Sequence, residues 1–155
     1  MSVRDDSLVF SDAQAITVSV ASNNPRTGFG SAGAGVLDTG GANSIGDQVK
    51  KSILKVTVGV PFVGPVGSTL SVFLQESNDN VIWVNSDLGN AFVNSLTMLQ
   101  QAGFSLLDGV LPRSGNSLAG VLGPAGRLGQ YLRVYYTVVG GPFTAGTINA
   151  WIEVW

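Results

Sequence analysis

The chain contains neither cysteine nor histidine in its 155 residues. Without cysteine it can form no disulfide and no thiolate metal site, and nothing marks an oxidising compartment. Without histidine it lacks the usual general base near neutral pH and the commonest metal ligand. Triads of the Ser-His-Asp type and HExxH zinc sites are therefore excluded, and we expect no catalytic residue, metal or cofactor.

Acidic residues leave one type of enzyme open, a hydrolase that uses a pair of carboxylates. The candidates are Glu76, Asp79, Asp87, Asp108 and Glu153. They are scattered along the chain, as expected for turns and strand edges. We therefore predict that the protein is not an enzyme.

Charge of either sign is scarce. Charged residues make up 12% of the chain and the formal net charge is −2, whereas a typical globular protein carries about 25% charged residues. Such a surface belongs either to a small glycine-rich β domain that tolerates it, or to a protein partly covered by partners in a permanent assembly. The few basic residues are scattered, so we expect no direct binding to nucleic acid.

Long hydrophobic runs are missing as well. No stretch approaches the roughly 18 apolar residues of a membrane span. The amino terminus reads MSVRDDSLVF and lacks the long apolar region of a secretory signal. The sequence therefore predicts no membrane contact and no secretory signal.

Short alternating strands are what the sequence does contain. Apolar and polar residues alternate in several short segments separated by turns rich in glycine, proline and asparagine. We predict strands at 15–21, 36–39, 50–60, 69–76, 81–84, 104–111, 131–138 and 147–155, and a strand followed by a turn at 91–101. This pattern indicates an all-β antiparallel sandwich or barrel of about eight strands with long Gly/Ser-rich loops. Residues 1–14 are expected to form an amino-terminal arm and residues 15–155 a single domain.

The last two strands are predicted to form a hairpin around Phe143, with one apolar face and one unusual outer face. In that register Arg133 lies opposite Glu153, Tyr135 opposite Trp151 and Tyr131 opposite Trp155. These six residues can form a sugar-binding platform, because aromatic rings stack on sugar faces. They can equally form a protein contact, since Trp, Tyr and Arg are enriched at interface hot spots. A third reading is that loops of the same chain or the amino-terminal arm cover them.

Two segments resemble a known family. LVFSDAQAIT at residues 8–17 and QYLRVYYTVVGGPFTAGTINAWI at residues 130–152 are similar to the capsid cement (decoration) proteins of tailed bacteriophages, which are small single jelly rolls. Weaker similarity covers VLDTG, KVTVGV, TLSVFLQES and FSLLDGVLP. The segments 22–35 and 113–126 depart from the family pattern and look like longer loops.

The resemblance implies a structural virion protein that is made in the host cytoplasm and lies on the outer surface of the capsid. Such a protein contacts several subunits of the major capsid protein, braces the shell against packaged DNA and associates with itself, with a dimer favoured over a trimer. Expected contacts are the arm, the loops 22–35 and 113–126, and a set of individual residues: Leu8, Val9, Phe10, Tyr131, Arg133, Tyr135, Trp151, Glu153 and Trp155. The competing interpretation is a carbohydrate-binding jelly-roll module of a phage tail or host-recognition protein.

Overall fold

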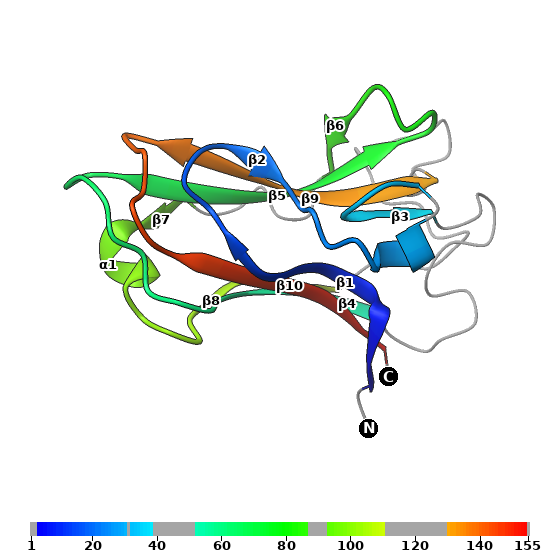
Figure 1. Ribbon diagram of the computed structural model, residues 1–155, viewed down its shortest axis with the longest axis horizontal. Helices are drawn as coiled ribbons and strands as arrows, with labels where there is room; N and C mark the ends of the chain where they lie inside the picture. Colours follow the sequence, from blue (N-terminus) through cyan, green and yellow to red (C-terminus); the bar gives the residue numbers. More distant parts are fainter. Residues whose placement is uncertain (1–2, 31, 39–51, 87–92, 111–129, 155) are drawn as a thin grey trace.

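Two antiparallel sheets pack face to face in the computed structural model (Figure 1), which describes residues 3–30, 32–38, 52–86, 93–110 and 130–154. Sheet A has the order β1 (Val3–Ala15), β10 (Thr147–Val154), β4 (Ser52–Val58), β8 (Ser105–Val110). The centre of sheet B is formed by β9 (Tyr131–Val139) and β5 (Thr69–Ser77). On β9 lie β2 (Val20–Ala21) and β3 (Val36–Asp38), and on β5 lie β6 (Val84–Asn85) and β7 (Val93–Ser95).

The strand order is that of a jelly roll. For this comparison β2 and β3 count as one interrupted strand, and β6 and β7 as another, which gives eight strands. Sheet A then contains the first, eighth, third and sixth strands, in that order. Sheet B contains the second, seventh, fourth and fifth strands. The fold class predicted from sequence is confirmed. In this order the last two strands, β9 and β10, belong to different sheets.

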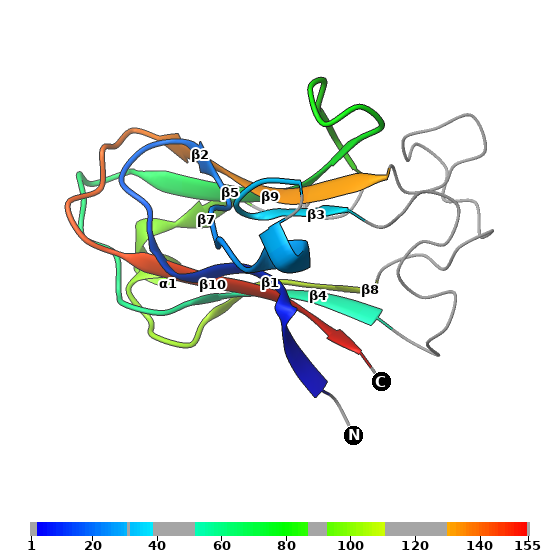
Figure 2. The same ribbon diagram turned by 45° about the vertical axis from the view of Figure 1, so that its right-hand side comes forward.

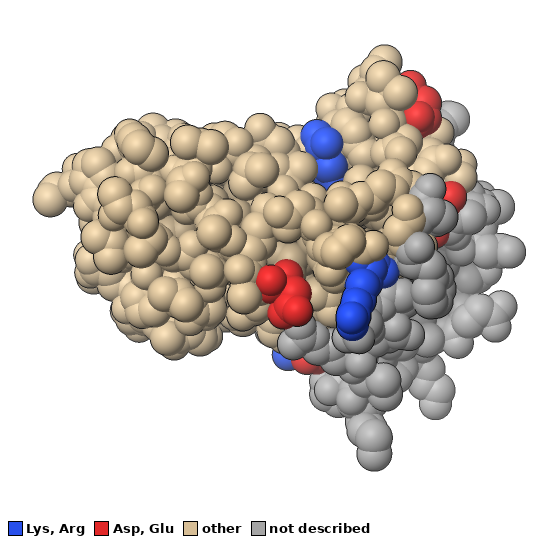
Figure 3. Space-filling view, in the orientation of Figure 1, with Lys and Arg blue, Asp and Glu red and all other residues tan. Residues whose placement is uncertain are grey.

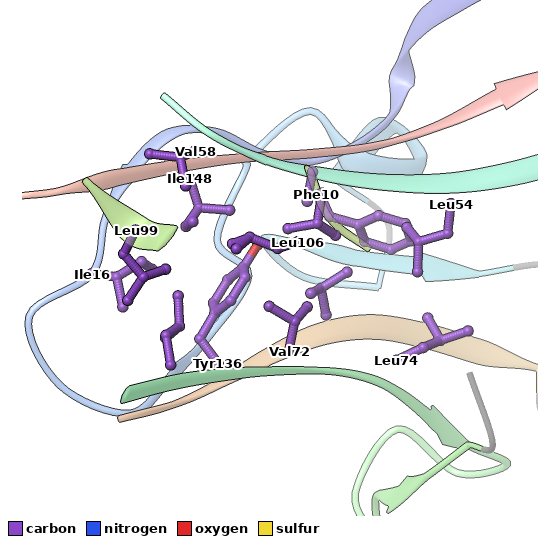
Figure 4. Close-up of a cluster of buried hydrophobic side chains, with 14 of the residues drawn as sticks. Phe10, Ile16, Leu54, Val58, Val72, Leu74, Leu99, Leu106, Tyr136 and Ile148 are labelled. Carbon is purple, nitrogen blue, oxygen red and sulfur yellow. The ribbon is translucent and has the colours of Figure 1, made fainter. Parts of the chain in front are cut away.

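The core lies between the sheets and follows from the alternation along each strand. In β5 the inward side chains are Leu70, Val72 and Leu74, and β9 contributes Leu132 and Val134. Figure 4 shows side chains from both sheets converging on this interior. Each fully buried aliphatic side chain contributes about 1.5 to 3 kcal/mol relative to an exposed one. The alternation therefore fixes which face of each strand points inward.

Tyr136 brings a polar group into this core. Tyr136 is fully buried, and its hydroxyl lies 2.7 Å from Ser11 Oγ. Ser11 Oγ donates to Gln14 Oε1 at 2.7 Å, and Gln14 Nε2 donates to the Ala21 carbonyl at 2.9 Å. Burial raises the pKa of Tyr136, so the phenol stays neutral. The network ties β1 of sheet A to sheet B without leaving the hydroxyl unsatisfied.

The amino-terminal segment is not a separate arm. Residues 3–15 form β1, which pairs with β10 as the edge strand of sheet A. Phe10 is 0% and Val9 2% exposed, and Leu8 packs against the core. The predicted boundary at residue 14 therefore falls inside a strand. The ladder of β1 is irregular, with register shifts between Arg4 and Val9, Val9 and Ser11, and Ser11 and Gln14.

The strand predicted over 15–21 is also wrong. The chain leaves sheet A at Ala15 and enters sheet B at Val20. Between them the backbone bonds to the crossing between β9 and β10, from Ile16 N to the Gly146 carbonyl and from Phe143 N to the Thr17 carbonyl. The alternation of apolar and polar residues continues through this turn although the turn is not a strand. The turn buries Ile16 and exposes Val18.

Two short helical segments complete the described structure. They are the 3₁₀ turn η1 (Thr27–Gly30) and α1 (Leu96–Leu99). In the segment predicted as strand and turn, β7 is followed directly by α1. Across the ranges given above, no helix is long and apolar enough to cross a membrane.

Candidate interaction surfaces

The predicted pairing of β9 with β10 is wrong. Residues 140–146 cross from sheet B to sheet A, so Arg133 lies opposite Gln75, and Tyr135 opposite Phe73, in the ladder of β9 with β5. In sheet A, Trp151 lies opposite Lys55. The crossing must be glycine-rich because Gly146 contacts the Phe62 ring where any side chain would clash. Phe62 in turn packs edge to face on Phe143, with ring centroids 4.9 Å apart.

The outward-facing residues therefore divide between two opposite faces of the sandwich. Tyr131, Arg133 and Tyr135 lie on the outer face of sheet B, whereas Trp151 and Glu153 lie on that of sheet A. Trp155 and the loop at 113–126 lie outside the described residues. One continuous surface of a partner therefore cannot contact both sets of residues at the same time.

The loop at 22–35 is held by the domain itself where it is described. Thr27 Oγ1 and Asn24 Nδ2 both donate to the Val9 carbonyl, at 2.6 and 2.7 Å. Ser22 Oγ donates to the Gly35 carbonyl at 2.7 Å and accepts from Val134 N at 3.1 Å. These bonds join the loop to β1 and β9, so it extends the sandwich.

On sheet A, Lys55 and Glu153 neutralise each other. Lys55 Nζ lies 3.1 Å from Glu153 Oε2, and Trp151 Nε1 donates to Glu153 Oε1 at 3.3 Å. The two charged side chains are 29% and 15% exposed. We call Lys55, Trp151 and Glu153 the paired cluster, because both carboxylate oxygens have partners within the chain.

On sheet B one cation is held by neutral groups. Arg133 Nε donates to Gln75 Oε1 at 2.8 Å, and Gln75 Nε2 donates to Asn85 Oδ1 at 2.9 Å. The guanidinium carbon lies 4.3 Å from the centre of the Trp83 ring and 5.5 Å from that of Tyr135. These distances are within the range of cation–π attraction. We call Gln75, Trp83, Arg133 and Tyr135 the arginine cluster.

The arginine cluster contains no carboxylate. Within the described ranges no acidic oxygen lies at salt-bridge distance from Arg133, and the bond to Gln75 is the only hydrogen bond of its guanidinium. Burial lowers the pKa of Arg133, and the neighbouring Tyr135 opposes this effect. The side chain still carries its charge at any physiological pH. A half-buried cation is therefore left without a counter-charge from the part of the chain that is described.

Trp83 reaches the cluster from a loop between β5 and β6 that projects from sheet B (Figure 2). Asp79 shapes the loop: it accepts hydrogen bonds from Val81 N, Ile82 N and Ser77 Oγ at 2.8 to 2.9 Å. The backbone bonds, with Ile82 first, hold the pKa of Asp79 below its usual range. Asn80 Nδ2 bonds to the Ala32 carbonyl at 2.9 Å. The loop thus presents Val81 and Ile82, 76% and 69% exposed, in a fixed conformation.

A second surface lies at the end of the sandwich far from both termini. Four connections meet there, at residues 16–19, 59–68, 96–104 and 140–146. No charged residue occurs in 13–25, 56–75, 93–107 or 134–152. The large exposed hydrophobic side chains of these connections and of the adjoining β9 include Val18, Val60, Val63, Val66 and Val139. We call this region the uncharged end, and Figure 3 shows its visible face without a single acidic or basic residue.

Sequence reasoning missed both surfaces in part. Gln75 and Trp83 were not expected beside Arg133, because their contact depends on the pairing of β5 with β9 and on a loop conformation. The uncharged end did leave a signal, since four long segments lack charge and each of them contains one of the four connections. This signal can be interpreted as one surface only when the strand order is known.

Comparison with known proteins identifies a family for this chain. No curated protein matches the chain. A family model described as Bbp16 matches residues 10–152, which extend from the middle of β1 through Ile152 of β10 and include all strands between them. The chain therefore belongs to the Bbp16 family, which is associated with bacteriophages.

Proposed function

We propose that this protein is a capsid cement protein, which binds the outside of an assembled phage head, bridges subunits of the major capsid protein and stabilises the shell. Membership in a phage-associated family supports a virion role. The observation that carries the proposal is the uncharged end. A partner can cover this surface without removing any charge from water, and removal of charge from water is the main cost of burying a protein surface.

The exposed valines give that contact its driving force. Val66 is 101% exposed, and Val18, Val60, Val63 and Val139 are each more than half exposed. Burial of apolar area contributes about 25 cal/mol per Å². Depletion of charged residues is also what distinguishes the buried centre of protein interfaces. The uncharged end has the chemistry of a surface that is covered in an assembly.

Stabilisation of the shell follows from mass action. A protein that binds the assembled shell and not its separated subunits stabilises the shell by RT ln(1 + [L]/Kd) at each site. Because many identical sites act on one particle, a modest affinity at each site sums to a large effect. No chemical step is required of the protein.

Purified virions test this proposal. We expect the chain to co-purify with them in a number of copies comparable to the major capsid protein, and we expect particles lacking it to lose DNA at a lower temperature. Its absence from virions, or decorated and bare particles with equal heat resistance, would refute the cement function.

A pair of substitutions tests the uncharged end. Val66→Glu adds a charge at a fully exposed position, so the free energy of unfolding should stay unchanged while shell occupancy falls about 10-fold. Ala34→Glu, at an exposed position near η1, adds the same charge outside the uncharged end and is the matched control. Wild-type occupancy for Val66→Glu would exclude the uncharged end as the contact.

The carbohydrate-binding alternative has its own outcome. Binding of the isolated protein to a glycan array, lost in Trp151→Ala, would favour a host-recognition module. A cement protein is expected to give no such binding.

A further inference from the structure

We propose that the arginine cluster is a docking site for a protein carboxylate, an Asp or Glu side chain that a neighbouring subunit in the shell inserts beside Arg133. This inference rests on the proposed cement function and names a second contact and its chemistry. The site lies on the outer face of sheet B and is separate from the uncharged end.

The guanidinium is positioned before any partner arrives. Trp83 stacks on it at 4.3 Å, and Gln75, itself held by Asn85, fixes its Nε. The terminal nitrogens of an arginine form a planar fork that matches a carboxylate with two parallel hydrogen bonds. Because the side chain is already ordered, a partner does not have to immobilise it, which lowers the entropic cost of binding.

Charge complementarity identifies the missing group. Arg133 is half-buried among Trp83, Tyr135 and Gln75, and none of these carries a negative charge. On sheet A, Lys55 has Glu153 at 3.1 Å. An arginine that is desolvated by rings, and has no anion beside it in the described part of the chain, gains most from a carboxylate supplied by a partner, because that anion is then itself shielded from water.

The surroundings favour a protein over an acidic sugar. One face of the Trp83 ring is covered by the guanidinium, which leaves less ring for stacking on a sugar. The neighbouring exposed residues are Val81, Ile82 and Val84. Their aliphatic side chains offer no hydrogen bond to hydroxyl groups but pack well against apolar side chains. An Arg and two aromatic residues surrounded by aliphatic contacts have the composition of a binding hot spot.

The decisive variant is Gln75→Glu. Its carboxylate would take the place of the amide oxygen that already accepts from Arg133 Nε. The chain then supplies its own anion, so folding stability should be equal or higher while affinity for shells assembled without this protein falls about 10-fold. Thr57→Glu adds the same charge on the outer face of sheet A and is the matched control, expected to bind like wild type.

Two substitutions of the arginine complete the test on the same shells. Arg133→Gln should weaken binding about 30-fold or more, the scale of a hot-spot residue. Arg133→Lys keeps the charge but loses the fork and should still bind about 10-fold more weakly than wild type. Lys55→Gln removes a cation from the paired cluster and should leave shell binding unchanged.

The outcomes separate the two proposals. If wild-type protein does not bind the shells, the cement function fails and this inference fails with it. If wild type binds and Gln75→Glu and Arg133→Gln bind equally well, the carboxylate docking site is overturned and the cement function stands. A glycan array that wild type binds through Arg133 would replace the protein partner with an acidic sugar. Support requires that a single Asp→Lys or Glu→Lys change on the shell surface restores the binding of Arg133→Glu.

Discussion

The outer faces of the two sheets contain similar residues in different arrangements. Each has a cation beside an aromatic ring on a long central strand: Lys55 near Trp151 on sheet A, and Arg133 near Tyr135 on sheet B. On sheet A the cation is neutralised by Glu153. On sheet B it is held by Gln75 and Trp83 and has no carboxylate in the described part of the chain.

The contrast shows that a cation beside an aromatic ring can serve either the stability of the fold or the recognition of a partner. An ion pair completed within the chain leaves little for a partner to gain. A cation that is positioned but not neutralised keeps its strongest interaction for another molecule. The following substitutions measure the two effects separately, because each face can be altered while the other is left intact.

The largest effect on stability is expected from Glu153→Lys, which breaks the paired cluster. The change removes the acceptor of Lys55 and of Trp151 and brings two cations together, so the free energy of unfolding should fall by about 2 kcal/mol. Glu153→Gln, which removes only the charge, should lose about 1 kcal/mol. Urea denaturation measures both. A double-mutant cycle with Lys55→Met isolates the pair, and a coupling of zero would show that sheet A gains nothing from it.

Trp83→Leu should have a smaller effect on stability and a larger one on binding. It removes the ring that stacks on Arg133, and an exposed cation–π contact contributes about 0.5 to 1 kcal/mol. Affinity for shells should fall with it, because the guanidinium is no longer ordered. Trp151→Leu, which removes the ring opposite Lys55 on sheet A, is the control for binding. Stability lost without any change in binding would assign Trp83 to packing alone.

The smallest effect concerns Asp79 and pH. Its folded-state pKa is lowered by the bonds from Ile82 and Val81, so its contribution is fully present above the unfolded value of about 3.9 and is lost as pH falls through the lowered pKa. We expect the emission of Trp83 to change below about pH 4, measured with Trp151 and Trp155 replaced by phenylalanine. Asp79→Asn should abolish the step. A step that persists in this variant would come from another carboxylate.

The residue pattern within each segment predicted the strands, but it did not predict which strands pair with each other. The alternation in β5, β9 and β10 reports which residues face inward, and this is a property of each segment alone. The pairing of β9 with β5 is decided by the crossing at 140–146, whose glycines allow either a hairpin or a passage between sheets. The preference for the crossing comes from burying Phe62 and Phe143 together, a long-range contact.

The candidate sites divide in the same way. The residue types expected at an interface were identified from Tyr131, Arg133 and Tyr135, which do face outward. Val9 and Phe10 were expected at an interface because residues 1–14 were predicted to form an arm that contacts the shell, but the pairing of this segment with β10 buries them. Trp83 could not be assigned from sequence, since its position depends on the turn that Asp79 forms.

The interrupted ladder of β1 bears on how copies of the protein coexist at high density. β1 is an edge of sheet A, and an unpaired edge is a template for another strand. Three register shifts and the left-handed Ala13, with φ of 48°, break the regular spacing of its hydrogen-bonding groups. If the protein has the cement function proposed above, copies packed side by side on a shell would bring such edges close together. The irregular edge guards against their fusing into a continuous sheet, so that each domain can be added or removed as a separate unit.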